Sequence, residues 1–335
     1  MARSGAVLEA ADPALAAAVA AGLATVEQRL REVVAASHPM LDLAASHLVE
    51  AGGKRVRPLL ALLAAQLGDP ASPAVVDAAV VVELTHLATL YHDDVMDEAD
   101  VRRGAASANS RWTNTVAILT GDYLFARASD LTAGLGTEAT HLQSRTFARL
   151  VEGQIGETAG PAEGQDPVEH HLQVIADKTA SLFAASARLG AMAAGAPAAQ
   201  VESAARFGEV LGTAFQLSDD LIDVLSDTDA SGKTPGTDLR EGIRTLPVLL
   251  MLAGDPDADS PASSRLRELL VGDLIDDALL AEALGLLRAH PAMTAAHERL
   301  AGFVAEARAA AGELPAGPVQ DALLSLTDFV LARTG

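Results

Sequence analysis

Apolar residues recur at helical spacing along most of this chain. In the stretch 14–34, one face collects Leu15, Val19, Val26, Leu30 and Val33. An α-helix turns once in about 3.6 residues, so these positions form a single apolar stripe. Asp12-Pro13 precedes the stretch, and an N-cap residue followed by proline favours a helix start. The pattern therefore predicts an ordinary first helix rather than a signal-peptide core.

The same spacing predicts further helices, separated by turns that are rich in glycine and proline. The expected ranges are 41–49, 59–67, 73–98, 115–131, 147–157 and 168–194, a helix that starts near 201, and a helical remainder over 248–335. Pro58 is expected to begin the helix after the Gly52-Gly53 turn. Beyond the alanine-rich first helix, we find no uninterrupted apolar run of about 18 residues, so we expect no membrane span.

Composition supports an all-α fold. Half of the residues (50%) are hydrophobic, only 3% are aromatic, and alanine and leucine dominate. These residues favour helices over the β-branched and aromatic content of sheets. A length of 335 residues allows about two domains or one large domain. Because no linker or shift in composition divides the chain, we expect a single domain over 1–335.

The charge balance narrows the range of partners. The chain has 24 basic and 45 acidic residues, a formal net charge of −21. Such a surface disfavours nucleic acid and anionic lipid as general partners, so an anionic ligand needs a local cationic cluster or metal ions. The chain has no cysteine, which excludes disulfides, thiolate nucleophiles and cysteine-bound zinc. We expect a cytoplasmic protein.

Three closely spaced aspartates follow an apolar helical run. Asp93, Asp94 and Asp97 form the first aspartate motif, within the sequence HDDVMD. Asp93 and Asp97 share a helix face, and Asp94 lies about 100° round from Asp93. Like charges this close repel one another and do not stabilise a helix. The motif therefore predicts a bound cation.

A second copy of this pattern occurs in FQLSDDLID. Asp219, Asp220 and Asp223 form the second aspartate motif, again after an apolar helical run. One such cluster in an acidic protein is explained by a solvated face, but two copies in the same context favour a shared metal site. Carboxylates without histidine or cysteine in the motif are typical of a hard cation, so Mg²⁺ is the natural candidate.

Basic residues that could bind an anion stand at five other places. The first is GGKRVRP with Lys54, Arg55 and Arg57, where a glycine turn before a helix suits an anion cradle reinforced by Lys54 and Arg57, although a solvated basic turn fits the same letters. His86 lies on the stripe of Asp93, about 10 Å below it, and is either a core residue or a ligand. The other candidates are Arg102 and Arg103, then Lys178 beside Thr179, and Lys233 in a loop with several glycines. Gln154 and Glu157 are interpreted as surface residues.

Other phosphate-binding sites fit less well. The chain has no GxxxxGK[ST] loop and no strand before a glycine fingerprint, which disfavours P-loop and dinucleotide folds. The spacing of DDVMDEADVRRG does not supply the oxygen ligands of an EF-hand. His92-Asp93 could suggest a helical phosphohydrolase, but such a site does not need a second paired aspartate motif.

These motifs together resemble the trans-polyprenyl diphosphate synthases of medium and long chain length. The matching segments are GGKRVRP at 52–58, HLATLYHDDVMD at 86–97, RRG at 102–104, Lys178-Thr179, FQLSDDLID at 215–223 and GKTPGTDL at 232–239. The resemblance implies a single helical bundle of the isoprenoid synthase type with a central cavity. It also implies a homodimer.

The resemblance implies that an allylic diphosphate ionises and the alkene of isopentenyl diphosphate attacks the cation. The six motif aspartates would hold three Mg²⁺ ions on the allylic diphosphate. Its other partners would be Arg102, Lys178, Thr179, Gln216 and Lys233. The diphosphate of isopentenyl diphosphate would be held by Lys54, Arg57, His86 and Arg103. The family needs no side-chain base, because the departing diphosphate is the usual proposed proton acceptor.

One departure from the family pattern concerns the segment after the second motif. The family commonly has Gly-Lys before Thr-Leu-Pro, whereas this chain has Gly242, Ile243 and Arg244 there. Moving a cation by one helical residue turns it by about 100°, so Arg244 is not assigned the contact of that lysine.

Product length depends on the two residues that precede the first motif by four and five positions. In short-chain members of the family bulky aromatics there form a floor, whereas this chain has Thr89 and Ala88. We therefore expect a product longer than C20, in the range used for quinone side chains, whose release is expected to need a membrane or detergent. Tyr91, Phe125 and Phe147 are candidates for a deeper floor.

Other functions stay open at this point. A farnesyl or geranylgeranyl diphosphate synthase would share every motif. A class I terpene cyclase would not need the cationic turn at Lys54 to Arg57 for a second diphosphate. A non-catalytic helical subunit would be expected to lose aspartates from one motif, and both motifs are intact.

Overall fold

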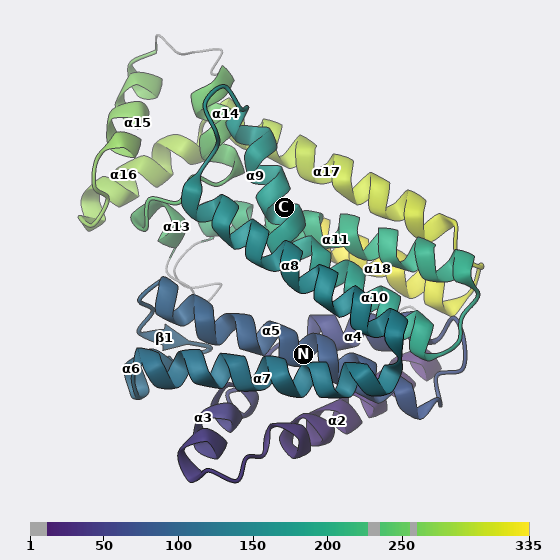
Figure 1. Cartoon of the computed structure of the whole chain (residues 1–335). Helices are drawn as coiled ribbons and strands as arrows, with labels where there is room; N and C mark the ends of the chain where they lie inside the picture. The colour runs from purple at the N-terminus through teal and green to yellow at the C-terminus, as the bar shows by residue number, and fades with distance from the viewer. Residues whose placement is uncertain (1–11, 227–234, 255–259, 335) are drawn as a thin grey trace. The chain divides into compact units, whose positions relative to one another are not determined.

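The computed structural model describes residues 12–226, 235–254 and 260–334. Helices dominate these ranges, which confirms the predicted all-α class (Figure 1). Their bounds are α2 Pro13–Val34, α3 Pro39–Glu50, α4 Val56–Ala65, α5 Pro73–Met96, α6 Ala108–Arg111, α7 Asn114–Leu135, α8 Thr137–Ala159, α9 Pro167–Ile175, α10 Ser181–Ala193, α11 Ala198–Leu225, α13 Thr237–Arg240, α14 Leu246–Gly254, α15 Pro261–Val271, α16 Asp277–Arg288, α17 Pro291–Gly312 and α18 Pro318–Ala332.

Contacts within the chain fall into two compact units that are interleaved along the sequence. Unit 1 comprises 1–149, 181–209 and 310–326, and unit 2 comprises 150–180, 210–309 and 327–335. The predicted single domain over the whole chain stays a prediction. Each aspartate motif lies in its own unit, the first in unit 1 and the second in unit 2.

Helix α5 is the core of unit 1. It packs against α7, α4, α10 and α2, and α5 and α7 run side by side (Figure 1). Residues on all sides of α5 are buried, including Val80, Leu84 and Leu87. A helix that is apolar all round is stable only when neighbours surround it, and this packing supplies the rigid support for the first aspartate motif.

Helix α5 is also long and apolar enough to pass a test for membrane-spanning helices by length and composition. Its most apolar window is 67% buried inside the protein, as expected of a core helix. Within the described residues no other helix passes the test. The expected lack of a membrane span stays a prediction.

Gly121 on α7 explains the close approach of this helix to α5. A Cβ at this position would lie 2.3 Å from Nε2 of His92 and 3.1 Å from the carbonyl oxygen of Ala88. The glycine therefore serves packing within the chain. The family resemblance also makes the helix around Gly121 a candidate subunit contact, and this stays a prediction.

Three predicted elements differ from the structure. Helix α4 begins at Val56 rather than Pro58, after Arg55 in the left-handed conformation. Helix α8 begins at Thr137, ten residues before the predicted range 147–157. The helix predicted over 168–194 is interrupted by η1, a π-helical turn over Ala176–Ala180. The segment after the first motif, for which no element was predicted, forms a short hairpin of β1 Val101–Arg102 and β2 Ala105–Ala106.

Unit 2 contains the C-terminal half of α11 and the helices that pack around the second motif. Helix α9 packs against α14, and α15 packs against α16. The Ser218 hydroxyl donates to the carbonyl oxygen of Val330, which ties α11 to the end of α18. The N-terminal end of α11 belongs to unit 1, where α4 and α5 pack against α10.

Candidate functional site

The first aspartate motif lies at the C-terminal end of α5. Asp93 and Asp94 are in its last turn, and Asp97 is the C-cap. The side chain of Asp94 is fully buried, and its Oδ1 accepts from Nε of Arg102 at 2.5 Å. Arg102 also places Nη2 3.9 Å from Oδ2 of Asp97. The hairpin therefore returns Arg102 over two of the three predicted metal ligands.

Asp94 keeps one carboxylate oxygen without a hydrogen-bond partner. This atom, Oδ2, is buried. Buried polar atoms are almost always paired, and an orphaned carboxylate oxygen suits a cation. An all-carboxylate motif with such an atom fits Mg²⁺, which proteins usually hold through one or two carboxylates.

Three of the four residues predicted to hold the second diphosphate come together in unit 1. Arg57 lies in the first turn of α4, His86 on α5, and Arg103 in the hairpin turn. The Arg57 guanidinium lies 5.2 Å from the centroid of the Phe183 ring, and its Nε is buried without a hydrogen-bond partner. The fourth residue, Lys54, is exposed in the glycine turn.

Burial and mutual repulsion set the protonation of this cluster. Burial lowers the pKa of Arg57 to about 10, which leaves it a cation at neutral pH. Burial, reinforced by the charges of Arg57 and Arg103, holds the pKa of His86 well below its usual value. His86 is therefore neutral at physiological pH and can offer a neutral hydrogen-bond donor beside two permanent cations.

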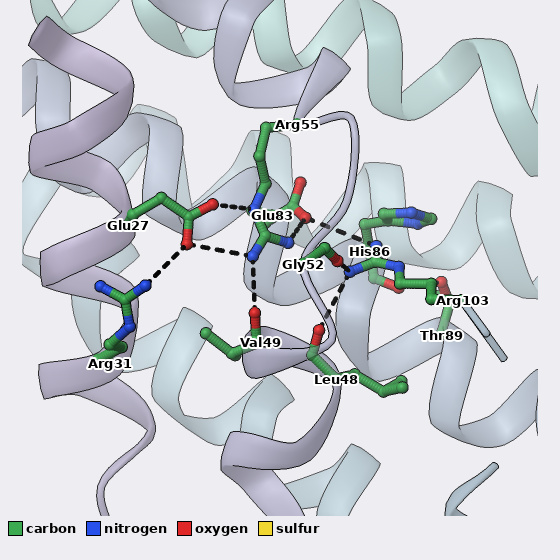
Figure 2. Close-up of polar contacts among 10 residues, drawn as sticks. All are labelled: Glu27, Arg31, Leu48, Val49, Gly52, Arg55, Glu83, His86, Thr89 and Arg103. Carbon is green, nitrogen blue, oxygen red and sulfur yellow. Dashed lines mark hydrogen bonds and ion pairs between the residues drawn. The ribbon is translucent and has the colours of Figure 1, made fainter. Parts of the chain in front are cut away.

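Arg55, the third cation of the glycine turn, is not available to a ligand. Its side chain is fully buried and forms ion pairs with Glu27 and Glu83 (Figure 2). Its Nη2 also donates to the carbonyl oxygen of Val49 at 3.1 Å. The structure therefore gives Arg55 a packing role, and Lys54 and Arg57 are the two cations of this turn that were predicted to bind an anion.

The second aspartate motif has different partners, all within unit 2. Asp219 forms an ion pair with Arg333, near the C-terminus. Asp220 lies 3.1 Å from Nε2 of His171. Asp223 accepts hydrogen bonds from two backbone N–H groups, that of Thr237 at 3.2 Å and that of Asp238 at 3.1 Å. No pattern in the sequence indicated Arg333 or His171 as partners.

The π-helical turn η1 presents the predicted lysine and threonine. Lys178 forms an ion pair with Glu157, a residue interpreted as plain surface from the sequence. Thr179 donates to Oε1 of Gln216 at 3.2 Å, and Gln216 donates to Oδ1 of Asp220 at 3.1 Å. Single π turns occur often at functional sites, so this interruption is a signal the periodicity did not reveal. The predicted Lys233 lies outside the described residues.

The described residues contain no group of three or more histidine or acidic side chains drawn together as metal ligands. Asp94 and Asp219 are instead paired with arginines. The donor chemistry of each motif still suits a hard divalent cation, because every side chain is a carboxylate. A metal ion would have to take the place of, or lie beside, these guanidinium groups.

The residues predicted to control product length are small and lie on α5. Ala88 is fully buried, and the Thr89 hydroxyl donates to the carbonyl oxygen of His86 at 2.8 Å. Two of the candidates for a deeper floor contact each other: the centroid of the Phe125 ring lies 4.2 Å from that of Phe147 and 5.8 Å from that of His92.

Comparison with known proteins gives consistent matches. A family model described as Polyprenyl synthetase matches residues 38–284. A nonaprenyl diphosphate synthase from Mycobacterium tuberculosis is 50% identical over 97% of this chain and 96% of its own. A dimethylallyltranstransferase from the same organism is 42% identical over 96% of this chain and 97% of its own. A similar solved structure is the crystal structure of a geranylgeranyl pyrophosphate synthase from Corynebacterium glutamicum complexed with calcium and isoprenyl diphosphate. It has a TM-score of 0.86 and 44% sequence identity, and the match covers 97% of this chain and 98% of that chain.

Proposed function

The chain belongs to the polyprenyl synthetase family and is a prenyltransferase, and from this premise we propose that it makes an all-trans polyprenyl diphosphate longer than C20. An allylic diphosphate and isopentenyl diphosphate are the proposed substrates. In each cycle the allylic C–O bond breaks and diphosphate leaves. The alkene of isopentenyl diphosphate then forms the new C–C bond, and a proton is lost to the departing diphosphate.

One observation carries this proposal. Helix α5 bears carboxylates at its C-terminal end and His86 two turns earlier, beside Arg57 and Arg103. The C-terminal end of α5 is therefore suited to an anion held through metal ions, and the position two turns earlier to an anion held directly by cations. A condensation of two diphosphates needs both kinds of site.

Magnesium is part of the proposal. The six aspartates of the two motifs would hold three Mg²⁺ ions. That the two motifs bind the same diphosphate through these ions is inferred from the family pattern. When bound, Mg²⁺ would neutralise the allylic diphosphate and make it a better leaving group. The calcium and isoprenyl diphosphate in the Corynebacterium glutamicum structure support a divalent cation and a diphosphate ligand.

The basic residues have separate proposed tasks. Arg102 and Lys178 would contact the allylic diphosphate, together with Lys233, while Thr179 and Gln216 add hydrogen bonds. Lys54, Arg57, His86 and Arg103 would hold isopentenyl diphosphate. Guanidinium groups suit this task because they match phosphate oxygens with several N–H donors in one plane.

The proposed chain length rests on the small side chains of Ala88 and Thr89 and on the similarity to a nonaprenyl diphosphate synthase. A geranylgeranyl or shorter product is the second candidate, because the Corynebacterium glutamicum protein bears that name at 44% identity. A class I terpene cyclase is less well supported, because it would not need the Arg57–Arg103 cluster.

Chromatography of products made from labelled isopentenyl diphosphate with several allylic primers tests the proposal. We expect products longer than C20, and we expect Thr89→Tyr to shift them toward shorter chains by placing a bulky ring in the path. Products that stop at C15 or C20 would exclude the long-chain proposal while keeping the reaction. A cyclic product formed without isopentenyl diphosphate would support the cyclase instead.

We also propose that the protein is a cytoplasmic homodimer. Ile118 and Leu119 on α7 are 43% and 58% exposed, and a subunit contact would bury this pair of apolar side chains. Native mass measurement tests this, and a monomer at micromolar concentration would contradict it.

A further inference from the structure

One buried carboxylate in unit 1 serves two arginines with different tasks. Arg55 donates from Nε to Glu27 at 2.5 Å and from Nη1 to Oε1 of Glu83 at 2.6 Å (Figure 2). The same oxygen of Glu83 lies 3.8 Å from Nη2 of Arg103. The Glu83 side chain is 2% exposed, so both ion pairs are shielded from solvent.

Arg55 does not need Glu83 for its own charge balance. Glu27 already receives two of its hydrogen bonds, from Nε at 2.5 Å and from Nη2 at 3.2 Å. Burying a further carboxylate is unfavourable, and a buried ion pair often stabilises no more than an apolar replacement would. The pairing with Arg55 therefore does not by itself explain why the Glu83 carboxylate is buried. Its contact with Arg103 gives a second reason.

Arg103 is held from several sides. Its Nη1 donates to the carbonyl oxygens of Gly52 and, at 3.2 Å, of Leu48, while its Nη2 faces Glu83. A Cβ on Gly53 would lie 2.9 Å from this guanidinium, so the glycine turn makes room for it. The guanidinium is thus part of the turn rather than a mobile surface group.

The backbone at both arginines points to the same conclusion. Arg55 has φ 49° and Arg103 has φ 54°, in the left-handed region that residues with a Cβ rarely adopt. Such conformations persist only where the surroundings hold them. Glu83 contacts the side chains of both residues, and it lies one turn before His86 on the same helix.

Charge adds a further role for Glu83. Burial lowers the pKa values of Arg57 and Arg103, and the carboxylate of Glu83 opposes that lowering in both. Arg55, Arg57 and Arg103 would repel one another without it. The carboxylate therefore allows three guanidinium groups to gather on one side of α5.

We propose that Glu83 is a positioning residue for isopentenyl diphosphate. It orients Arg103 directly and touches no substrate itself. The inference rests on the proposed function, because it takes Arg103 as a ligand of that diphosphate. Holding Arg103 in place before binding reduces the entropy lost when the substrate is bound.

Steady-state kinetics on Glu83→Gln tests the proposal, with Glu27→Gln as the matched control. Glutamine keeps the size of glutamate and removes the charge. We expect Glu83→Gln to raise KM for isopentenyl diphosphate by about tenfold, because Arg103 loses its buried counter-charge, and to change KM for the allylic primer by less than about twofold. Glu27→Gln also weakens the hold on Arg55, so Tm falls, but KM for isopentenyl diphosphate stays near the wild-type value.

A purely structural Glu83 gives a different result. Both glutamine variants would then lower Tm and leave both KM values unchanged, which overturns the proposal. If Glu83→Gln does not fold, Glu83→Asp serves instead, since it keeps the charge but draws the carboxylate back. That variant must raise KM for isopentenyl diphosphate by about threefold, and an unchanged KM again overturns the proposal.

A double-mutant cycle separates this inference from the proposed function. Arg103→Lys alone should raise KM for isopentenyl diphosphate, and the double variant with Glu83→Gln should be little worse, because Glu83 acts through Arg103. Fully additive effects would overturn the inference. An unchanged KM in Arg103→Lys, or a wild-type protein without elongation activity, would instead count against the proposed function.

Discussion

The two aspartate motifs have nearly the same sequence but obtain their counter-charges in different ways. Asp94 is paired with Arg102, which is 8 positions away along the chain. Asp219 is paired with Arg333, 114 positions away. The first motif is therefore completed by a local hairpin, and the second by the end of α18.

The environments of the two pairs differ as well. The Asp94 side chain is fully buried and Arg102 is 28% exposed, whereas Asp219 is 31% exposed and Arg333 only 13%. Arg333 also lies 4.7 Å from the ring centroid of Phe215 and 5.9 Å from that of Phe329. In the first motif the carboxylate is the enclosed partner, and in the second it is the arginine. Access to the carboxylate therefore differs between motifs that look equivalent in sequence.

The largest expected effects come from neutralising one carboxylate in each motif. Asp94→Asn and Asp219→Asn should each lower kcat by about 100-fold or more, because both remove a proposed ligand of the metal that assists ionisation. Turnover at saturating Mg²⁺ measures this. The control is Asp130→Asn, which changes an aspartate of unit 1 whose side chain is 72% exposed. Its kcat should equal that of the wild type. Wild-type turnover in either motif variant would contradict the proposed metal role.

A smaller effect is expected at the arginines, with a difference between the motifs. Arg102→Met should lower kcat, because Arg102 is a proposed partner of the diphosphate. Arg333→Met should lower Tm of the metal-free protein by about 1–2 °C, equivalent to about 1 kcal/mol for a partly exposed pair in a chain of 335 residues. It should also lower the Mg²⁺ concentration for half-maximal thermal stabilisation, because Asp219 is then free of a competing cation.

The exposed pair Arg308–Asp328 provides the control for Arg333. Both side chains are about half exposed, at 49% and 59%, so Arg308→Met should change neither Tm nor the Mg²⁺ midpoint by much. An unchanged Mg²⁺ midpoint in Arg333→Met would show that the arginine does not compete with the metal at Asp219.

The smallest effect concerns pH and His86, on the same helix as the first motif. Its pKa is lower in the folded protein than in the unfolded chain, mainly because of burial, so the unfolded chain binds more protons below about pH 6.5. The stability that depends on neutral His86 is present above that pH and is lost as the pH falls. Urea unfolding of the wild type should show a loss of up to about 1.4 kcal/mol per pH unit from this group, absent in His86→Gln. Equal pH dependence of the two proteins would contradict this.

Local sequence determined a large part of this protein. The apolar spacing predicted most helices, and Asp12 caps α2 by accepting from the N–H of Leu15, as expected. The two aspartate motifs and the segments that carry the family resemblance are each short. These features depend on residues within a few helical turns, and helical periodicity and motif spacing record such short-range relations directly.

Tertiary structure alone decided which side chains meet. The sequence pattern and the family resemblance left Arg55 out of the predicted anion site but gave it no role, because its burial against Glu27 and Glu83 depends on how α2 and α5 pack. The partners of the second motif lie 49 and 114 residues away, and no local pattern records such a distance. Charges are placed by the packing of helices far apart in sequence, so the counter-ions of an aspartate motif follow from the fold rather than from the motif.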